Sequence, residues 1–230
     1  MCFNKDKSIL KKLKSISDLK SVYAKKKHDL GKNRELIKIC VLDNDGFDVQ
    51  QLNKVGYKNI DVRESFDNIA DFSKYHLILC DVDGIGAKIN IKKQGLYVAD
   101  ELYKSYYPLT QVAIYTGQEL SNYEYSEVAG IQVIDKNIPW SNLIEKIDQI
   151  CAVFWNPEKT WELLEGYFKK NGLSNKEIAV LENIFVQGAT NTNETNILQR
   201  TKVIDSSLAE TIIYNGFKFA IMAFKIYHET

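Results

Sequence analysis

Four short stretches of the sequence place polar side chains directly after runs of apolar residues. These side chains are Asp43, Asn44 and Asp45 in VLDND, Asp81 and Asp83 in LILCDVDG, Thr116 in VAIYTG, and Lys136 in VIDKN. Clustered carboxylates bind a hard cation such as Mg²⁺ through oxygen, and a carboxylate can also attack phosphorus to form an aspartyl phosphate. A hydroxyl and an ammonium group can hold phosphoryl oxygens by hydrogen bonds. The set therefore indicates phosphoryl chemistry, provided that the fold brings the four stretches together.

Short apolar runs alternate with helix-like segments from residue 36 onward. The runs are LIKICVL (36–42), NIDVR (59–63), YHLILC (75–80), QVAIY (111–115) and GIQVI (130–134). The helix-like segments are 47–56, 65–74, 95–108, 119–130 and 141–155. Continuous apolar strands alternating with helices predict an α/β fold with a doubly wound, five-stranded parallel sheet. In such a sheet ligands bind outside the carboxyl ends of the strands, which is where the four polar stretches fall.

Over about residues 36–155 the chain resembles the receiver domains of two-component response regulators. The resemblance rests on the four stretches above and on GLYVADELYKSYYP (95–108), which looks like a receiver's third helix. It implies a flavodoxin-like fold and a signalling protein that is switched by phosphorylation, not an enzyme with turnover. It also implies a phosphodonor, either a histidine kinase or a phosphotransfer protein.

The resemblance implies a role for each polar residue at the strand ends. Asp81 would be the phospho-acceptor, Thr116 the switch hydroxyl, and Lys136 the partner of the phosphoryl group. Mg²⁺ would be held by Asp43, Asn44, Asp45 and Asp81, with the backbone carbonyl of Asp83 as a further ligand.

The chain departs from the receiver pattern in four places. Asn44 stands where the family has a second adjacent acid, and an asparagine carbonyl can ligate a metal but brings no charge. Asn137 replaces the proline after the lysine, and Val133 replaces an aromatic switch residue on the fifth strand. The loop GIGAKINIKKQ (84–94) is longer and more basic than the family pattern leads us to expect.

Two alternatives share the same residues. A degenerate receiver would keep the fold and bind partners without phosphorylation. A haloacid-dehalogenase-type phosphatase is the other, because DVDGI (81–85) and DNDGF (43–47) both resemble the DxDG motif of those enzymes. Such a phosphatase needs a further acidic pair after the lysine, where we find Asp148 and Asp205.

The N-terminal segment, residues 1–34, is strongly basic. It carries eleven basic and three acidic side chains, a net charge of +8, whereas the 230-residue chain as a whole has a net charge of zero. Apolar residues at helical spacing predict an amphipathic helix over 8–30 that is stopped by Gly31. Its basic face could contact nucleic acid, an anionic membrane surface or an acidic partner, or stay solvated while the helix packs on its own domain.

The C-terminal segment, residues 156–230, contains no clear strand and predicts a helical output or interaction domain. Pro157 and the pair Ser174 and Glu177 mark helix starts, the latter as a capping box. LSNKEIAVLENIFVQG (173–188) looks like the opening of a LuxR-type helix-turn-helix. The last helix, however, offers few basic residues among many apolar ones, which indicates core or a homodimer or partner interface. DNA binding is therefore kept as an alternative.

The remaining composition fits a reduced, cytoplasmic protein. The four cysteines, Cys2, Cys40, Cys80 and Cys151, form no CxxC pair, and neither a zinc site nor a disulfide framework is expected. No apolar run approaches the length of a membrane span, and the basic N-terminus lacks the apolar region of a signal peptide.

Overall fold

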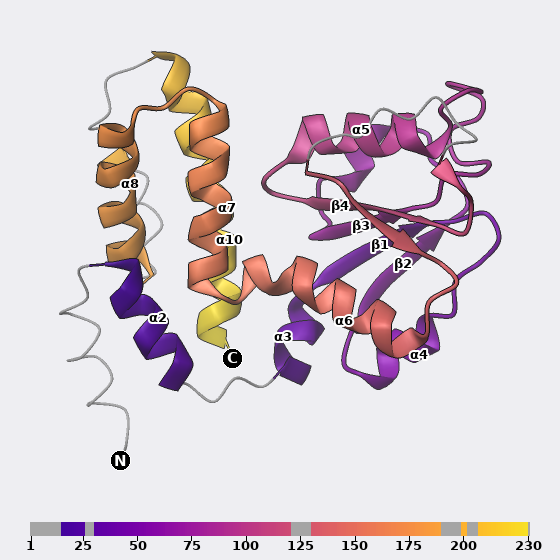
Figure 1. Ribbon diagram of the computed structural model, residues 1–230, viewed down its shortest axis with the longest axis horizontal. Helices are drawn as coiled ribbons and strands as arrows, with labels where there is room; N and C mark the ends of the chain where they lie inside the picture. The colour runs from indigo at the N-terminus through magenta and orange to yellow at the C-terminus, as the bar shows by residue number, and fades with distance from the viewer. Residues whose placement is uncertain (1–14, 26–29, 121–129, 190–198, 202–206, 230) are drawn as a thin grey trace. The chain divides into compact units, whose positions relative to one another are not determined.

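The computed structural model describes residues 15–25, 30–120, 130–189, 199–201 and 207–229. These residues belong to two compact units (Figure 1). One unit is formed by residues 30–151 and contains all the polar stretches singled out above. The other is formed by the described residues that precede and follow it in the chain.

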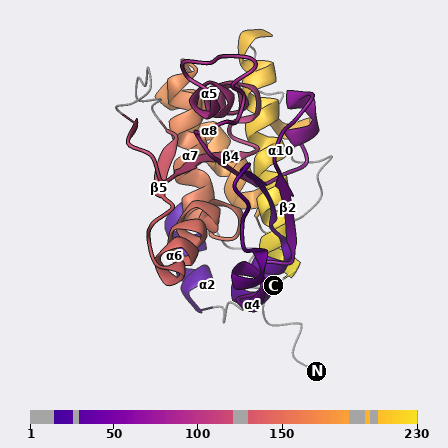
Figure 2. The same ribbon diagram turned by 90° about the vertical axis from the view of Figure 1, so that its right-hand side faces the viewer.

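A five-stranded, all-parallel sheet is the centre of the first unit. The strands are β1 (Lys38–Leu42), β2 (Asn59–Arg63), β3 (Leu77–Cys80), β4 (Gln111–Thr116) and β5 (Gln132–Asp135). Their order is β2-β1-β3-β4-β5, so β2 and β5 are the two edges (Figure 2). The prediction of an α/β fold with a five-stranded parallel sheet is confirmed, and this order is the one found in flavodoxin-like folds.

Helices cover both faces of this sheet. Helix α5 (Gly95–Tyr106) lies on one face, and α4 (Val49–Lys54) and α6 (Trp140–Cys151) lie on the other (Figure 1). Val98, Ala99 and Leu102, on the buried side of α5, form one apolar cluster with Ile78 of β3 and Ile114 of β4. Residues 77–80 are buried throughout, as expected of a central strand covered on two sides.

Two of the predicted helices differ in the structure. Within 65–74 there is only a short 3₁₀ helix, η1 (Ile69–Phe72). Asn68 accepts a hydrogen bond from Ala70 N, and the Ser73 hydroxyl donates to Ala70 O, so short polar side chains hold a turn here instead of a longer helix. The predicted helix stop at Gly31 is wrong, because α3 (Leu30–Leu36) runs through it. The predicted helix at 119–130 falls mostly outside the described residues.

The second unit is helical in its described residues. Its elements are α2 (Ile16–Lys25), η3 (Ala152–Phe154), α7 (Pro157–Lys170), α8 (Asn175–Gly188) and α10 (Ser207–Glu229). The predicted helix start at Pro157 is confirmed, and so is the capping box of Ser174 and Glu177. Lys20 of α2 forms an ion pair with Glu158 of α7 at 2.7 Å.

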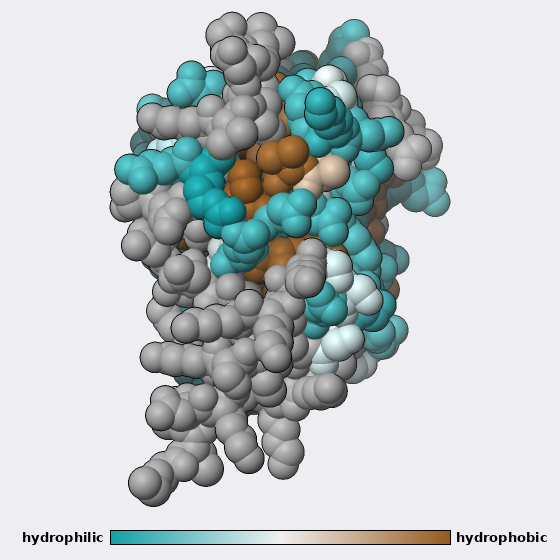
Figure 3. Space-filling model, turned by 90° about the vertical axis from the view of Figure 1, so that its left-hand side faces the viewer, coloured by the Kyte–Doolittle hydropathy of each residue, from teal (hydrophilic) through white to brown (hydrophobic). Residues whose placement is uncertain are grey.

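Aromatic side chains fill the core of this helical unit. Phe217 of α10 stacks on Phe168 of α7, and Phe224 packs against Phe185 of α8. Most apolar residues in the described part of the last helix are therefore core, whereas Tyr214, Lys218 and Lys225 are exposed. On the side that bears α8, hydrophobic side chains gather between hydrophilic ones (Figure 3). Among the described helices, none combines the length and the apolar character needed to cross a membrane.

Gly95 lets α5 begin directly against the end of β3. Its backbone N donates to Val82 O at 3.0 Å. A Cβ at Gly95 would lie 1.8 Å from the backbone oxygen of Asp81. Since backbone atoms on both sides would have to move, only glycine fits at this contact.

We expect Gly95→Ala to lower the free energy of unfolding by about 2 kcal/mol, the usual scale of a steric clash inside a packed core. Urea denaturation of the full-length protein, followed by circular dichroism, measures this. Gly117→Ala is the matched control, because its Cβ would meet Asn137 Nδ2 at an ordinary 3.5 Å. Equal stability of the two variants would contradict the close approach of α5 and β3.

Candidate functional site

The parallel sheet brings the predicted residues to one edge. Asp43 follows β1, Asp81 follows β3, Thr116 ends β4 and Lys136 follows β5. The hydrogen-bond ladder extends one residue beyond the strands: Asp43 N donates to Arg63 O at 3.0 Å and Asp81 N to Leu42 O at 2.8 Å. Lys136 N in turn donates to Thr116 O at 3.0 Å. The backbones of the two acids and the lysine are therefore fixed by the sheet itself.

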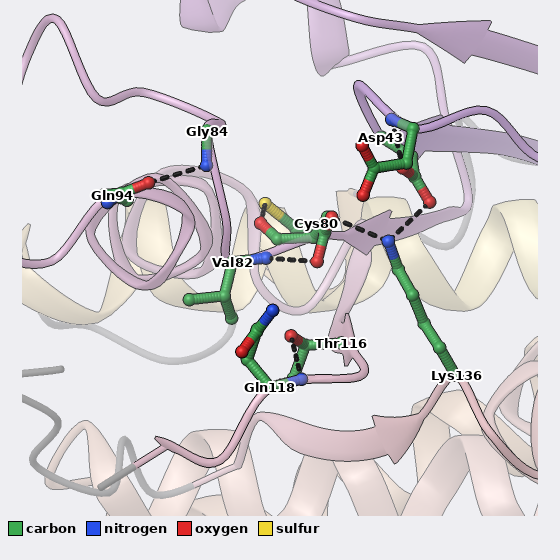
Figure 4. Close-up of polar contacts among 10 residues, drawn as sticks. Asp43, Cys80, Val82, Gly84, Gln94, Thr116, Gln118 and Lys136 are labelled. Carbon is green, nitrogen blue, oxygen red and sulfur yellow. Dashed lines mark hydrogen bonds and ion pairs between the residues drawn. The ribbon is translucent and has the colours of Figure 1, made fainter. Parts of the chain in front are cut away.

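The Lys136 ammonium lies between two buried carboxylates. Its Nζ is 2.8 Å from Asp43 Oδ2 and 2.6 Å from Asp81 Oδ2 (Figure 4). The Asp43 and Asp81 side chains are only 1% and 3% exposed, and that of Lys136 is 19% exposed. Burying two carboxylates side by side is unfavourable unless a cation compensates them. Lys136 supplies that cation from the end of the edge strand β5.

Each carboxylate also accepts one backbone hydrogen bond. Asp43 Oδ1 accepts from Asp45 N at 2.9 Å, and Asp81 Oδ1 accepts from Val82 N at 2.7 Å. One oxygen of each acid is thus held by its own loop, and the other faces the shared ammonium. The two carboxylates are oriented before any ligand binds.

Burial and the shared ion pairs shift the pKa values of Asp81 and Lys136. Burial raises the pKa of Asp81, and Lys136 opposes this only in part. Burial also disfavours the charged form of Lys136, but its hydrogen bonds to Asp43 and Asp81 outweigh this and raise its pKa. The charged Lys136 therefore adds stability that is complete below its ordinary pKa of about 10.4 and is lost as the pH rises through the raised value.

Three carboxylates converge at the site. One oxygen from each of Asp43, Asp45 and Asp81 lies within 4.8 Å of the others. Asp43 and Asp81 are buried, whereas Asp45 is exposed. Three hard oxygen donors with an excess of negative charge fit a divalent cation such as Mg²⁺. The predicted metal ligands Asp43, Asp45 and Asp81 are therefore close enough to share one ion.

The other predicted ligands lie at the rim. Asn44 is exposed, and a Cβ at Gly84 would come within 2.6 Å of its Nδ2, so its amide packs over the glycine that follows Asp83. The Asp83 side chain is also exposed, and among the described residues it is not one of the three clustered carboxylates. Thr116 is buried, and its Oγ1 accepts a hydrogen bond from Gln118 N at 3.1 Å (Figure 4). The Thr116 hydroxyl hydrogen can therefore be donated to a ligand.

The sequence pattern did not indicate the cluster of three aromatic side chains beside Lys136. Lys136 Nζ lies 5.4 Å from the ring centroid of Tyr115, the residue before Thr116. The Tyr115 ring meets Phe47 edge-on at 5.7 Å, and Phe47 meets Trp140 of α6 at 5.4 Å. Val133, which stands where the receiver pattern has an aromatic residue, lies on the edge strand β5 and is 41% exposed. The sequence signal for Tyr115 was its position next to Thr116 on a strand that ends at the site.

Asp148, the acid that the phosphatase alternative would need, is engaged elsewhere. Its two oxygens accept hydrogen bonds from Arg34 at 3.0 and 2.5 Å, and Oδ1 also accepts from the Tyr57 hydroxyl at 2.7 Å. Asp205 lies outside the described residues. Within the part of the chain that the structure describes, the acids gathered at the site are Asp43, Asp45 and Asp81.

Comparisons with known proteins add no family to this geometry. No protein-family model matches the chain, and neither a curated protein nor a solved structure matches it. The chemistry of the site therefore rests on its own residues.

Replacing Lys136 by methionine should destabilise the protein at neutral pH by about 3 kcal/mol, because two buried carboxylates lose their shared cation. Asp81→Asn should act in the opposite direction and stabilise the protein by roughly 1 kcal/mol, since it removes a carboxylate that burial disfavours. Urea denaturation of both variants beside the wild type measures the two effects. A loss of stability in Asp81→Asn similar to that in Lys136→Met would contradict the proposed charge balance.

The stabilisation by Asp81→Asn should also depend on pH. Because the folded protein raises the pKa of Asp81, the contribution of Asp81 to the free energy of unfolding falls as the pH rises from the ordinary aspartate range through that raised value. The advantage of the asparagine variant should therefore be larger at about pH 7.5 than at about pH 4.5. A gap that widens on acidification would show that the sign of the pKa shift is wrong.

Asp45→Asn should weaken Mg²⁺ binding about tenfold, because it replaces a charged ligand by a neutral one at the most exposed corner of the group. Isothermal titration calorimetry measures the dissociation constant. Asp135→Asn is the matched control: this acid ends β5, is exposed, and is not one of the three clustered carboxylates. Equal weakening in both variants would indicate only a general effect of negative charge.

Proposed function

We propose that residues 30–151 form a receiver-type switch that accepts a phosphoryl group on Asp81 with the help of Mg²⁺. One observation carries the proposal: a single ammonium, that of Lys136, is held between the buried carboxylates of Asp43 and Asp81 at the carboxyl edge of a parallel sheet. A third carboxylate and the Thr116 hydroxyl, which ends the neighbouring strand β4, complete a set that can hold a cation and an oxyanion.

The transfer step follows from these groups. A carboxylate oxygen of Asp81 attacks phosphorus and forms a new O–P bond, while the P–N bond of a phosphohistidine breaks and its electron pair stays on the imidazole nitrogen. With a small acyl phosphate, a P–O bond breaks instead and the carboxylate leaves. Lys136 can turn from Asp81 Oδ2 to the transferred phosphoryl oxygens, and Thr116 can donate its hydroxyl hydrogen to them.

Mg²⁺ would be held by Asp43, Asp45 and Asp81, whose oxygens lie within 4.8 Å of one another. When bound, the ion would offset the negative charge of the carboxylates and of the phosphoryl group. Asn44 and the backbone carbonyl of Asp83 are nearby in sequence and remain candidate neutral ligands. The net negative charge of the site favours a divalent cation over a second ammonium.

Tyr115 connects the site to aromatic side chains outside it, so a movement of Lys136 can change their packing. In the unphosphorylated state Lys136 lies over the Tyr115 ring, which contacts Phe47 and through it Trp140. A lysine that moves to a phosphoryl group changes this contact and with it the packing of the aromatic group. We propose that this group takes the place of the aromatic switch residue that Val133 does not provide.

The partners in this proposal are proteins. A histidine kinase or phosphotransfer protein in the cytoplasm would supply the phosphoryl group, and residues 156–230 would pass the signal on by changing homodimerisation or partner binding. The role is one of binding and switching, not turnover. DNA binding is less favoured, because the buried aromatic side chains of α10 form core and its exposed basic residues in the described stretch are few.

Incubation with acetyl phosphate and Mg²⁺ should add one phosphoryl group to the wild-type protein, as measured by intact-protein mass spectrometry. The adduct should be absent in Asp81→Asn and in the presence of EDTA, and strongly reduced in Lys136→Met. Asp83→Asn is the matched control, since its exposed side chain lies two residues further along and has no role in the transfer.

Three results would contradict this proposal. An adduct that persists in Asp81→Asn and disappears in Asp43→Asn would move the nucleophile to the DNDG motif and favour the phosphatase alternative. Multiple turnover of a phosphate ester would do the same. A folded, Mg²⁺-binding protein that forms no adduct with either acetyl phosphate or phosphoramidate would favour a degenerate receiver.

A further inference from the structure

The loop between β3 and α5, residues 84–94, presents two large apolar side chains to solvent. Ile89 is 58% exposed and Ile91 is 77% exposed, the two highest values among the exposed large apolar side chains of the described residues. Between and beside them stand Lys88, Asn90, Lys92 and Lys93, and the segment GIGAKINIKKQ contains no acid. Phosphoryl transfer to Asp81 uses none of these side chains.

The loop is held in shape by its own hydrogen bonds. Ile89 N and Asn90 N both donate to Gly86 O, at 2.9 and 3.0 Å, and Gln94 N donates to Asn90 O at 2.7 Å. The Asn90 side chain accepts from Lys92 N and Lys93 N at 3.2 and 3.0 Å. Because the backbone polar groups are paired internally, the isoleucines are displayed by a preformed turn, which lowers the entropy lost on binding.

Both ends of the loop are anchored at the candidate site. Gly84 N donates to Gln94 Oε1 at 2.6 Å and closes the base of the loop (Figure 4). Gly84 also lies against Asn44, and the next residue after Gln94 is Gly95, which contacts the Asp81 backbone. The base of the loop is therefore tied to the edge of the sheet that carries the candidate site.

We propose that this loop binds an anionic lipid bilayer surface. Ile89 and Ile91 would enter the boundary between headgroups and acyl chains, and Lys88, Lys92 and Lys93 would contact anionic headgroups. Lysine and isoleucine suit this division, because a long lysine stem keeps its ammonium in water while apolar neighbours are buried. Anionic lipid attracts each nearby lysine, so charge and apolar burial act together.

A protein partner fits the loop less well. Protein interfaces are enriched in aromatic residues and arginine and depleted in lysine, and their strongest contacts come from tryptophan, tyrosine and arginine. The segment 84–94 contains no aromatic residue and no arginine. The loop therefore lacks the residues of a typical protein-binding hot spot, whereas its lysines and exposed isoleucines supply the charge and the apolar area that binding to an anionic bilayer surface needs.

Co-sedimentation of the full-length protein with vesicles tests the proposal. We use phosphatidylcholine vesicles with and without about 30% phosphatidylserine, a composition that gives the surface a negative potential. The wild type should bind the anionic vesicles, and the double variant Ile89→Ser, Ile91→Ser should bind them at least about tenfold more weakly. Val62→Ser, Val133→Ser is the matched control, because these valines are 38% and 41% exposed on the edge strands and should not affect binding.

The basic N-terminal segment, residues 1–34, is unchanged in both variants, so its electrostatic attraction cancels in the comparison. Undiminished vesicle binding by the isoleucine variant would overturn the proposal, and so would a wild type that does not bind anionic vesicles or binds neutral ones equally well. Loss of phosphotransfer from a phosphohistidine protein in the isoleucine variant, without vesicle binding by the wild type, would assign the loop to a protein partner instead.

The vesicle test is independent of the proposed phosphorylation. The isoleucine variant should still accept a phosphoryl group from acetyl phosphate, because both isoleucines are exposed to solvent and neither belongs to the set of residues proposed to bind Mg²⁺ or the phosphoryl group. Vesicle binding without any adduct on Asp81 would support the membrane-surface loop and contradict the receiver-type switch. An adduct on Asp81 without loop-dependent vesicle binding would support the receiver-type switch and contradict the membrane-surface loop.

Discussion

A single lysine ammonium shared by two buried carboxylates is the constraint on which the rest of the site depends. Asp43 and Asp81 follow neighbouring strands and lie almost out of solvent, so their negative charges would repel each other in a poorly hydrated place. Lys136 reaches them from the end of β5, with its Nζ within 2.8 Å of both. Any ligand that enters must take over part of this charge balance. In the proposed function a divalent cation and a phosphoryl group would do so together, because the cation would compensate the carboxylates and the phosphoryl oxygens would accept hydrogen bonds from the lysine.

The sheet supplies the precision that this balance needs. Strands β1, β3 and β4 are covered by helices on both faces and are almost wholly apolar, so the first polar side chains appear where the strands end. Continuation of the hydrogen-bond ladder to Asp43, Asp81 and Lys136 fixes their backbones. The same close packing brings the start of α5 against Asp81 at Gly95, and from this point the loop with Ile89 projects into solvent.

Much of this could be predicted from the sequence, for a physical reason. Buried parallel strands leave continuous apolar runs, and each of the five runs overlaps an observed strand to within one residue at its C-terminal end. The meeting of their ends follows from topology alone. The prediction of a helix over 65–74 was wrong because the Asn68 and Ser73 side chains form hydrogen bonds with the backbone of Ala70. The spacing of apolar residues does not reveal this competition for backbone hydrogen bonds. Three contacts could not be predicted: Lys136 between two acids, Lys136 over Tyr115, and the pairing of Arg34 with Asp148. They depend on side-chain packing between segments far apart in the chain, which the spacing of residue types does not reveal.

The most direct test of the central claim is a crystal structure of the protein with Mg²⁺ and beryllium fluoride, a stable analogue of a phosphoryl group. We expect beryllium bonded to a carboxylate oxygen of Asp81, with Lys136 and Thr116 on its fluorides and the metal on Asp43 and Asp45. Beryllium bonded to Asp43 instead, with Lys136 still on Asp81, would contradict the assignment of Asp81 as the acceptor and of Lys136 as the group that moves to the phosphoryl oxygens.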